Sequence, residues 1–301
     1  MNTRDFLPKE LTEKPIFTDE VWEECRNSKD FMPILFEWYK YIAGMCNKLA
    51  DISKDSPAIK EMSTLNYAVL TGLLNRCSRL MTSNLRLSVT HKYGETIALL
   101  DRSIHESAVI VQWLCLNDSE DGFKRYLAFG MKNDIILKNH ILASISERNG
   151  EILVIEKSML DSIEDFVIST GLTEEQIKET KPLPNLWSMC REIGFSERFY
   201  IGIQRMGSHE VHGTWTSLRT HYLMRDNQGE YRLRDLDVPP HENQFMDIPM
   251  MILYALVKFI ECVVEDDGFR EPISSILDDS ISEMQKLISE ITREDFELAP
   301  E

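Results

Sequence analysis

Apolar residues recur every three or four positions along most of the chain, which is the spacing of one face of an α-helix. After Pro33 this spacing is kept by Ile34, Trp38, Ile42, Met45 and Leu49. The stretch 58–147 has almost no helix-breaking residues and predicts three long helices, and further helices are expected near 151–170, 241–264 and 271–293. We therefore predict an all-α fold, built as an antiparallel helical bundle.

One segment departs from the helical spacing. In "HYLMRDNQGEYRLRDL" (221–236), apolar and polar residues alternate on both sides of Asn227–Gly229. Alternation around an Asn- and Gly-containing turn is typical of a β-hairpin. We expect one small β-hairpin as an excursion from the bundle.

The two ends of the chain differ in pattern from its middle. Residues 1–18 are expected to form a polar arm, because Pro8 and Pro15 interrupt any helix there. Residues 19–293 contain no repeat and no low-complexity tract, so we predict a single helical domain. The sequence closes with an acidic tail, 294–301.

The chain is acidic, with a formal net charge of −17. This charge opposes general binding to DNA and to anionic membranes. Residues 60–148 nevertheless hold eleven Lys and Arg against nine Asp and Glu, a balance of +2. A local basic cleft is therefore compatible with the acidic whole, although acidic residues that simply collect on solvated helices and tails explain the same numbers.

Several features indicate a cytoplasmic protein that does not enter membranes. The first residues lack the apolar run of a signal peptide. The most apolar segment, 248–264, contains Pro249, Lys258 and Glu261, whereas a membrane span needs about 20 apolar residues. The six cysteines form no CxxC pair and are expected to be buried, reduced thiols.

Candidate chemistry is concentrated in "QRMGSHEVHGTWTSL" (204–218). Ser208 is placed to cap a helix on which His209 and His212 share a face. Gly213 would lie inside that helix and would mark a close approach by another backbone or by a ligand. Trp215, further along, is expected to be a packing residue rather than a stacking platform.

Metal chemistry has a weak basis in this segment. The zinc-protease motif needs histidines four apart, and HEVH is one residue short. A metal held by His209 and His212 with a distant carboxylate stays open as an alternative. We expect no cofactor and no metal.

A second segment, "LLDRSIHESAVIVQWL" (99–114), supplies a partner helix. Arg102 and Glu106 lie one helical turn apart on an otherwise apolar stripe, so they must be paired or face a cleft. One interpretation is a buried ion pair that fixes the helix register. The other is a functional pair, in which Arg102 binds an anion and Glu106 orients a histidine.

The combination of "LLDRSIHESAVIVQWL", "RYLAFGMKNDIILKNHI" and, after a gap, "FYIGIQRMGSHEVHGTWTSL" resembles a widespread bacterial family of all-helical proteins of unknown function. That family is marked by an Arg-x-x-x-Glu helix and a Gly-Ser-x-x-x-His-Gly-x-Trp segment. The resemblance covers residues 60–225. It implies Arg102, Glu106, Ser208 and His212 as signature positions and brings no established activity.

More distantly, the arrangement is similar to the HEPN superfamily, whose helical RNases use an Arg-x(4 to 6)-His motif. Arg205 and His212 fit this motif with six intervening residues. In that superfamily both residues lie on one helix, whereas here Gly207 and Ser208 are expected to start the helix after Arg205. Arg102 is the alternative source of the cation.

Two functions of different classes follow. The first is a metal-independent RNA endonuclease of toxin or antiviral-defence type, in which His212 is the base, Arg102 or Arg205 stabilises charge, and Glu106 orients the imidazole. The HEPN resemblance implies a site built across a homodimer. The second is a non-catalytic module that binds a partner protein or small ligand, with Arg102, Glu106 and His212 as a buried polar network.

Overall fold

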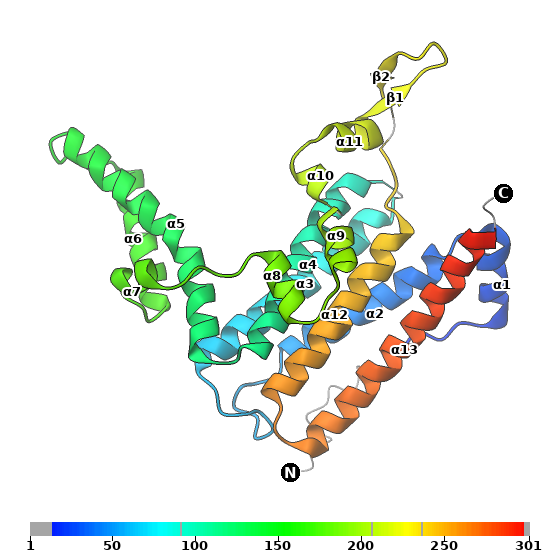
Figure 1. Ribbon diagram of the computed structural model, residues 1–301, viewed down its shortest axis with the longest axis horizontal. Helices are drawn as coiled ribbons and strands as arrows, with labels where there is room; N and C mark the ends of the chain where they lie inside the picture. Colours follow the sequence, from blue (N-terminus) through cyan, green and yellow to red (C-terminus); the bar gives the residue numbers. More distant parts are fainter. Residues whose placement is uncertain (1–13, 91, 206, 236, 298–301) are drawn as a thin grey trace. The chain divides into compact units, whose positions relative to one another are not determined.

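The computed structural model shows a helical protein with one two-stranded hairpin (Figure 1). It describes residues 14–90, 92–205, 207–235 and 237–297, and of 203–205 and 293–297 it describes the backbone alone. The predicted all-α fold with a small β-hairpin is confirmed. Most of the polar arm expected at 1–18 lies outside the described residues, as does the end of the acidic tail.

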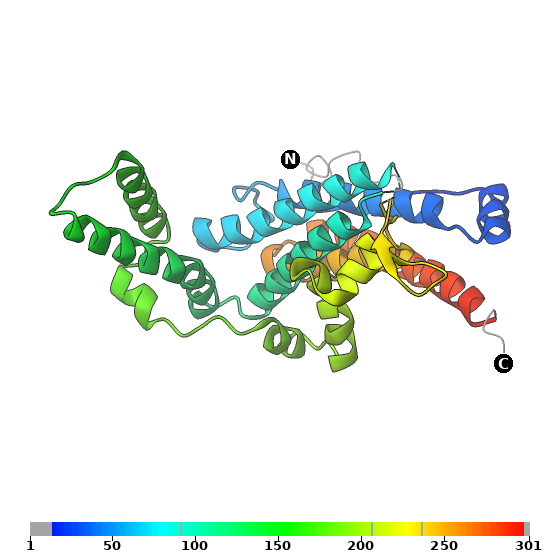
Figure 2. The ribbon, with the colours of Figure 1, turned by 90° about the horizontal axis from the view of Figure 1, so that it is seen from above.

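The chain forms two compact units, of which the first joins the residues before 117 to those after 185. Its long helices are α1 (Asp19–Ser28), α2 (Met32–Ala50), α3 (Thr64–Ser88), α4 (Gly94–Leu116), α12 (Glu242–Val263) and α13 (Asp267–Glu297). Helix α12 packs against α2, α4 and α13, and α3 packs against α2 and α4. Figures 1 and 2 show α13 running along α12.

Helix α12 is the central element of this core, as its apolar sequence predicts. Its fully buried side chains include Phe245, Ile252, Leu256 and Phe259. The Tyr39 ring of α2 lies 4.9 Å from that of Phe245, centroid to centroid. Burial of one such side chain stabilises the fold by about 1.5–3 kcal/mol, so α12 anchors the bundle.

Short elements run along α4, from α8 beside its C-terminal end to α10 near its start, and continue to the hairpin (Figure 1). They are α8 (Leu186–Glu192), α9 (Glu197–Arg205), α10 (Ser208–Val211), α11 (Trp215–Ser217), the π-helical turn η3 (Leu218–Tyr222), β1 (Leu223–Arg225) and β2 (Tyr231–Leu233). The strands pair antiparallel, with Met224 opposite Arg232. The turn between them contains Asn227–Gly229, where the sequence places it.

The second unit spans residues 117–185. It contains α5 (Glu120–Glu147), α6 (Val154–Ser169) and α7 (Glu174–Glu179) around a small apolar cluster of Ala128, Ile135 and Ile177. Both α6 and α7 pack against α5. The single domain expected over residues 19–293 stays a prediction, because two compact units can belong to one cooperative domain.

The cysteines and the apolar helices match their expected roles. All six cysteines are free thiols, and five of them are buried. The apolar segment 248–264 lies in the buried helix α12 and its end. No helix in the described part of the chain combines the length and the apolar composition that crossing a membrane needs.

Candidate functional site

The two segments that carry the candidate chemistry meet in the structure, because α10 packs against α4. Gly207, immediately before α10, makes the closest approach. A Cβ atom at this position would lie 2.3 Å from the carbonyl oxygen of Ala98 and 2.8 Å from Cβ of Arg102. Its φ of +73° is also one that glycine adopts most readily. Gly207 therefore permits the contact between the two segments.

The sequence predicted this role for Gly213 and the capping role for Ser208, and both assignments are wrong. Helix α10 is one turn long and ends at Val211, so Gly213 lies beyond it with a φ of +53°. A Cβ atom added to Gly213 would meet no heavy atom within 4 Å. The residue that caps α10 is Gly207, and Ser208 is its first helical residue. The close-packing glycine thus precedes the histidines instead of following them.

The two histidines of the motif have separate surroundings. Nδ1 of His209 lies 2.9 Å from the hydroxyl of Thr214, so His209 braces the turn after α10. His212 is exposed, and no side-chain hydrogen bond joins it to another described residue. Among the described residues no group of three or more His, Cys, Asp or Glu side chains could hold a metal ion, so the metal alternative gains no third ligand.

Arg102 and Glu106 form the expected ion pair, with 3.0 Å between Nη2 and Oε1. Of the two interpretations, the buried ion pair is wrong, because the side chains are 23% and 43% exposed. An ion pair one helical turn apart and open to solvent stabilises by about 0.3–0.5 kcal/mol. Arg205 ends α9 and is therefore on a different helix from the histidines, and its side chain lies outside the described part of the chain.

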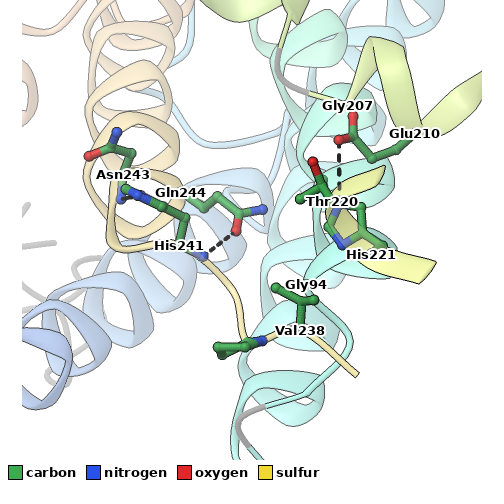
Figure 3. A pocket seen from close by; sticks show the side chains of 11 residues that line it. Gly94, Gly207, Glu210, Thr220, His221, Val238, His241, Asn243 and Gln244 are labelled. Atoms are coloured by element: carbon green, nitrogen blue, oxygen red, sulfur yellow. Dashed lines mark hydrogen bonds and ion pairs between the residues drawn. The ribbon is translucent and has the colours of Figure 1, made fainter. Parts of the chain in front are cut away.

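A pocket of about 320 Å³ lies beside this contact in the first unit (Figure 3). Ala98 of α4 forms part of its lining. One wall comes from α10 and η3 and includes Glu210 and His221. The other wall is the start of α12, with His241 and Gln244. Figure 3 shows these two walls facing each other across the pocket.

Glu210 and His221 form a buried polar pair on the first wall. Oε1 of Glu210 lies 3.6 Å from Nε2 of His221, and the side chains are 14% and 9% exposed. This separation is too long for a hydrogen bond. The second carboxylate oxygen of Glu210 and Nδ1 of His221 are buried without a hydrogen-bond partner in the described chain. The unused hydrogen-bonding capacity of the pair therefore lies within the wall.

Glu95, in the first turn of α4, fixes the segment that carries His221. One of its carboxylate oxygens accepts a hydrogen bond of 2.8 Å from the buried hydroxyl of Ser217, and the other accepts one from the hydroxyl of Tyr222. The second bond raises the pKa of Tyr222. Because one donor stands directly before η3 and the other is its last residue, Glu95 holds the first wall against α4.

The second wall is fixed through a buried carboxyl group, that of Asp101. Gln244 accepts a hydrogen bond of 2.7 Å from the backbone of His241 and donates one of 2.7 Å to Asp101. Asn84 donates a third, also of 2.7 Å, to the other oxygen of Asp101. Burial raises the pKa of Asp101 to about 8, although the two donors act in the opposite direction. The Gln244 side chain is therefore fixed at both ends.

His105 lies one turn after Asp101 on the same face of α4 and is fully buried. Neither of its ring nitrogens has a hydrogen-bond partner among the described residues. Burial lowers the pKa of His105 to about 3, because the charged imidazolium would lose its hydration. The ring is therefore neutral in the folded protein.

Sequence reasoning missed Asp101, His105, Glu210 and His221, and it also missed Glu95, His241 and Gln244. Asp101 and His105 each stand directly before a residue that was selected, Arg102 and Glu106. A second polar pair at helical spacing was therefore visible in the same stretch.

Comparison with protein families gives one match. Residues 67–231, more than half of the chain, match the model of a family of unknown function, DUF5677. Neither curated proteins nor solved structures gave a match. The matched range includes α4, α10 and the first strand of the hairpin, and so both segments that meet at Gly207. The chain belongs to this family of unknown function.

Proposed function

We propose that this protein binds a small polar molecule in the pocket between α4, α10 and the start of α12. The observation that carries the proposal is the pocket itself, whose two walls place Glu210 and His221 opposite His241 and Gln244. Side chains of these types include both hydrogen-bond acceptors and donors. A small polar ligand between the walls can therefore be held from two sides.

The walls of the pocket are also suited to a ligand, because their polar groups are already oriented. Hydrogen bonds to Glu95 fix the wall that carries His221, and a hydrogen bond to Asp101 fixes Gln244 on the opposite wall. Pockets with a few fixed polar groups among apolar ones are typical small-molecule sites, and about 320 Å³ is at the lower end of their usual volumes. Pre-oriented groups bind without a further loss of side-chain entropy.

A fragment screen by ligand-observed NMR tests this proposal. Ala98→Leu adds three carbon atoms at the pocket lining and should abolish the binding of fragments that bind the wild type. Ala68→Leu makes the same change at an exposed position of α3 and serves as the matched control. If no fragment binds the wild type, or if Ala98→Leu binds the same fragments equally well, the pocket is not a ligand site.

The RNA endonuclease remains a second candidate, favoured by the contact of Gly207 with the turn of α4 that carries Arg102. His212 is exposed, as a base that acts on an RNA 2′-hydroxyl has to be. Trp215 packs edge-on against Tyr231, with 5.2 Å between the ring centroids, and is also 57% exposed, as a base-stacking residue would be. Glu106 pairs with Arg102, which argues against its proposed role in orienting His212.

In this second proposal the protein acts in the cytoplasm of a bacterium, as a toxin or antiviral effector, and as a homodimer. The test is cleavage of total RNA by wild type and by His212→Ala at matched soluble levels. His140→Ala, at an exposed position of α5, controls for the loss of a histidine. Cleavage that survives in His212→Ala excludes His212 as the base, and a wild type that does not cut removes the proposal.

A further inference from the structure

We infer that a second site of this protein, on helix α3, binds the phosphate group of a small phosphate monoester. The site is a groove of about 310 Å³ lined by Gly72, Asn75, Arg76, Arg79 and Leu80, and we call it the α3 groove. No described residue lines both this groove and the pocket between α4, α10 and α12. The inference therefore goes beyond the proposed function and does not depend on it.

Two arginines supply the charge of the α3 groove. Arg76 and Arg79 are three positions apart and are therefore neighbours on one face of the helix. Both are exposed and line the groove, so a ligand in the groove can contact them. No hydrogen bond or ion pair joins the guanidinium group of Arg79 to another described residue. That of Arg76 has one long hydrogen bond, of 3.4 Å, to the hydroxyl of Ser107. Most N–H donors of the two groups are thus available to a ligand.

The acidic residues that could neutralise these arginines are absent from α3 or engaged elsewhere. Helix α3 has three arginines and no acidic residue, although the chain as a whole has 50 Asp and Glu. The two helices that pack most extensively against α3 are α2 and α4. Glu37 of α2 and Glu106 of α4 each pair with a basic residue of their own helix. Glu95 and Asp101, the other acids of α4, accept hydrogen bonds from the pocket walls. The positive charge of the groove is therefore available to an external anion.

The arginine pair favours a phosphate monoester over other anions. A guanidinium group presents its N–H donors in a planar fork that matches the oxygens of a phosphate or a carboxylate. Two such groups carry two positive charges, which the doubly charged end of a monoester balances better than a singly charged carboxylate or phosphate diester does. The anion also relieves the repulsion between two like charges one helical turn apart. The side-chain amide of Asn75 adds a neutral donor to the same groove.

Gly72 and Leu80 suit the organic part of such a ligand. Gly72 lies inside α3, where glycine destabilises a helix relative to alanine. No neighbouring group requires a glycine there, because a Cβ atom at Gly72 would meet no heavy atom within 4 Å. The missing side chain instead leaves space in the groove, and Leu80 adds carbon surface to its lining. A ligand whose phosphate contacts the arginines can thus lay its organic group against the helix.

Four probes with the same aromatic ring test the inference: phenyl phosphate, methyl phenyl phosphate, benzoate and phenol. Dissociation constants are measured by NMR titration of the full chain at about pH 7.5, where the monoester is doubly charged, and at about 0.15 M salt, which screens distant charges. We expect phenyl phosphate to bind wild type on the order of tenfold more tightly than the diester and benzoate, with phenol weakest. Arg76→Gln and Arg79→Gln should each weaken the binding of phenyl phosphate on the order of tenfold. Arg79→Lys keeps the charge without the planar fork and should lie between Arg79→Gln and wild type.

Arg86→Gln is the matched control, because it removes the same charge from an exposed position of α3 outside the groove lining. It should change the dissociation constant of phenyl phosphate by less than about twofold, since salt screens a charge at that distance. Far-UV circular dichroism and thermal melting establish that each variant is folded. Ala98→Leu, which blocks the pocket of the proposed function, should bind phenyl phosphate as wild type does.

Four results would overturn the inference. Phenyl phosphate does not bind wild type, or the probes bind with equal affinity. Arg79→Gln keeps the wild-type affinity, or Arg86→Gln loses as much affinity as Arg79→Gln does. A diester that binds as tightly as the monoester contradicts the assignment to a monoester. Loss of phenyl phosphate binding in Ala98→Leu would place the phosphate in the other pocket, so the two proposals can fail separately.

Discussion

Nε2 of Gln244 donates a hydrogen bond of 2.7 Å to the buried carboxyl group of Asp101, so a residue of the pocket wall is joined directly to the core of the bundle. The same carboxyl group accepts a hydrogen bond from Asn84 of α3, which also donates to the hydroxyl of Tyr39 in α2. Four helices therefore meet at one buried acid. The protonation of Asp101 therefore affects the stability of the fold and the position of Gln244 in the pocket wall.

The first prediction concerns the pH dependence of stability that Asp101 imposes. Burial raises its pKa to about 8 in the fold, whereas in the unfolded chain it is about 4. Because the fold favours the protonated acid, its stabilising contribution is complete below about pH 4 and is lost as the pH rises to about 8. The loss is on the order of a few kcal/mol. In Asp101→Asn this part of the pH dependence should be absent.

Urea denaturation at pH values from 5 to 8.5 measures this effect. All five tryptophans lie in the first unit, so their fluorescence reports the unfolding of that unit. The informative quantity is the slope against pH, because the amide also changes the hydrogen bonding of Asn84 and Gln244. Equal slopes for wild type and Asp101→Asn would contradict the raised pKa.

The second prediction concerns His105, whose pKa is lowered to about 3 by burial. Since the unfolded value is about 6.5, its stabilising contribution is present above about pH 6.5 and is lost as the pH falls toward 3. In His105→Leu that acid-dependent loss should disappear. At pH 7 the variant should also gain about 1–2 kcal/mol, because neither ring nitrogen has a partner in the described chain.

Thermal and urea unfolding at pH 5 and pH 7 test this expectation. His140→Leu replaces an exposed histidine and should leave the tryptophan-detected transition unchanged. A His105→Leu protein that is less stable than wild type at both pH values would show that the ring nitrogens do have partners.

The third prediction separates the two glycines of the motif. Gly207→Ala should destabilise the fold by more than about 2 kcal/mol, because the new Cβ meets the carbonyl oxygen of Ala98 and the backbone φ is positive. Gly213→Ala keeps only the cost of a positive φ, about 1–2 kcal/mol, since nothing lies within 4 Å. Urea unfolding measures both, and a larger loss for Gly213→Ala would place the close approach there instead.

The contrast between these glycines illustrates what the sequence could and could not predict. Helical spacing correctly located the long helices, and alternation around Asn227–Gly229 correctly located the hairpin. Both are local properties of the chain. Which glycine touches α4 depends on where α10 ends, and a one-turn helix leaves no periodic pattern from which to read its end.

The same reason explains the polar residues that were missed. On α4 two pairs at helical spacing stand side by side, Asp101 with His105 and Arg102 with Glu106. Only the packing of α3 and α12 decides that the first pair is buried and the second open to solvent. Glu210 and His221 are likewise separated in the sequence by α11 and the start of η3, and no fixed sequence spacing predicts a contact across such a segment.

The last prediction concerns the wall that carries His221. Ser217→Ala removes the buried donor to Glu95, at a cost of about 1 kcal/mol, and leaves the hydroxyl of Tyr222 to hold that carboxylate. Because the bond joins the end of α11, directly before η3, to α4, backbone amides of 217–223 should exchange with solvent faster while those of α12 are unaffected. Hydrogen exchange with mass spectrometry measures this difference in exchange rate.

Ser289→Ala, which removes an exposed hydroxyl bonded within α13, is the control and should change the exchange of neither segment. Unchanged exchange at 217–223 in Ser217→Ala would mean that Glu95 does not hold this wall, and faster exchange throughout α12 would mean that the serine supports the whole bundle.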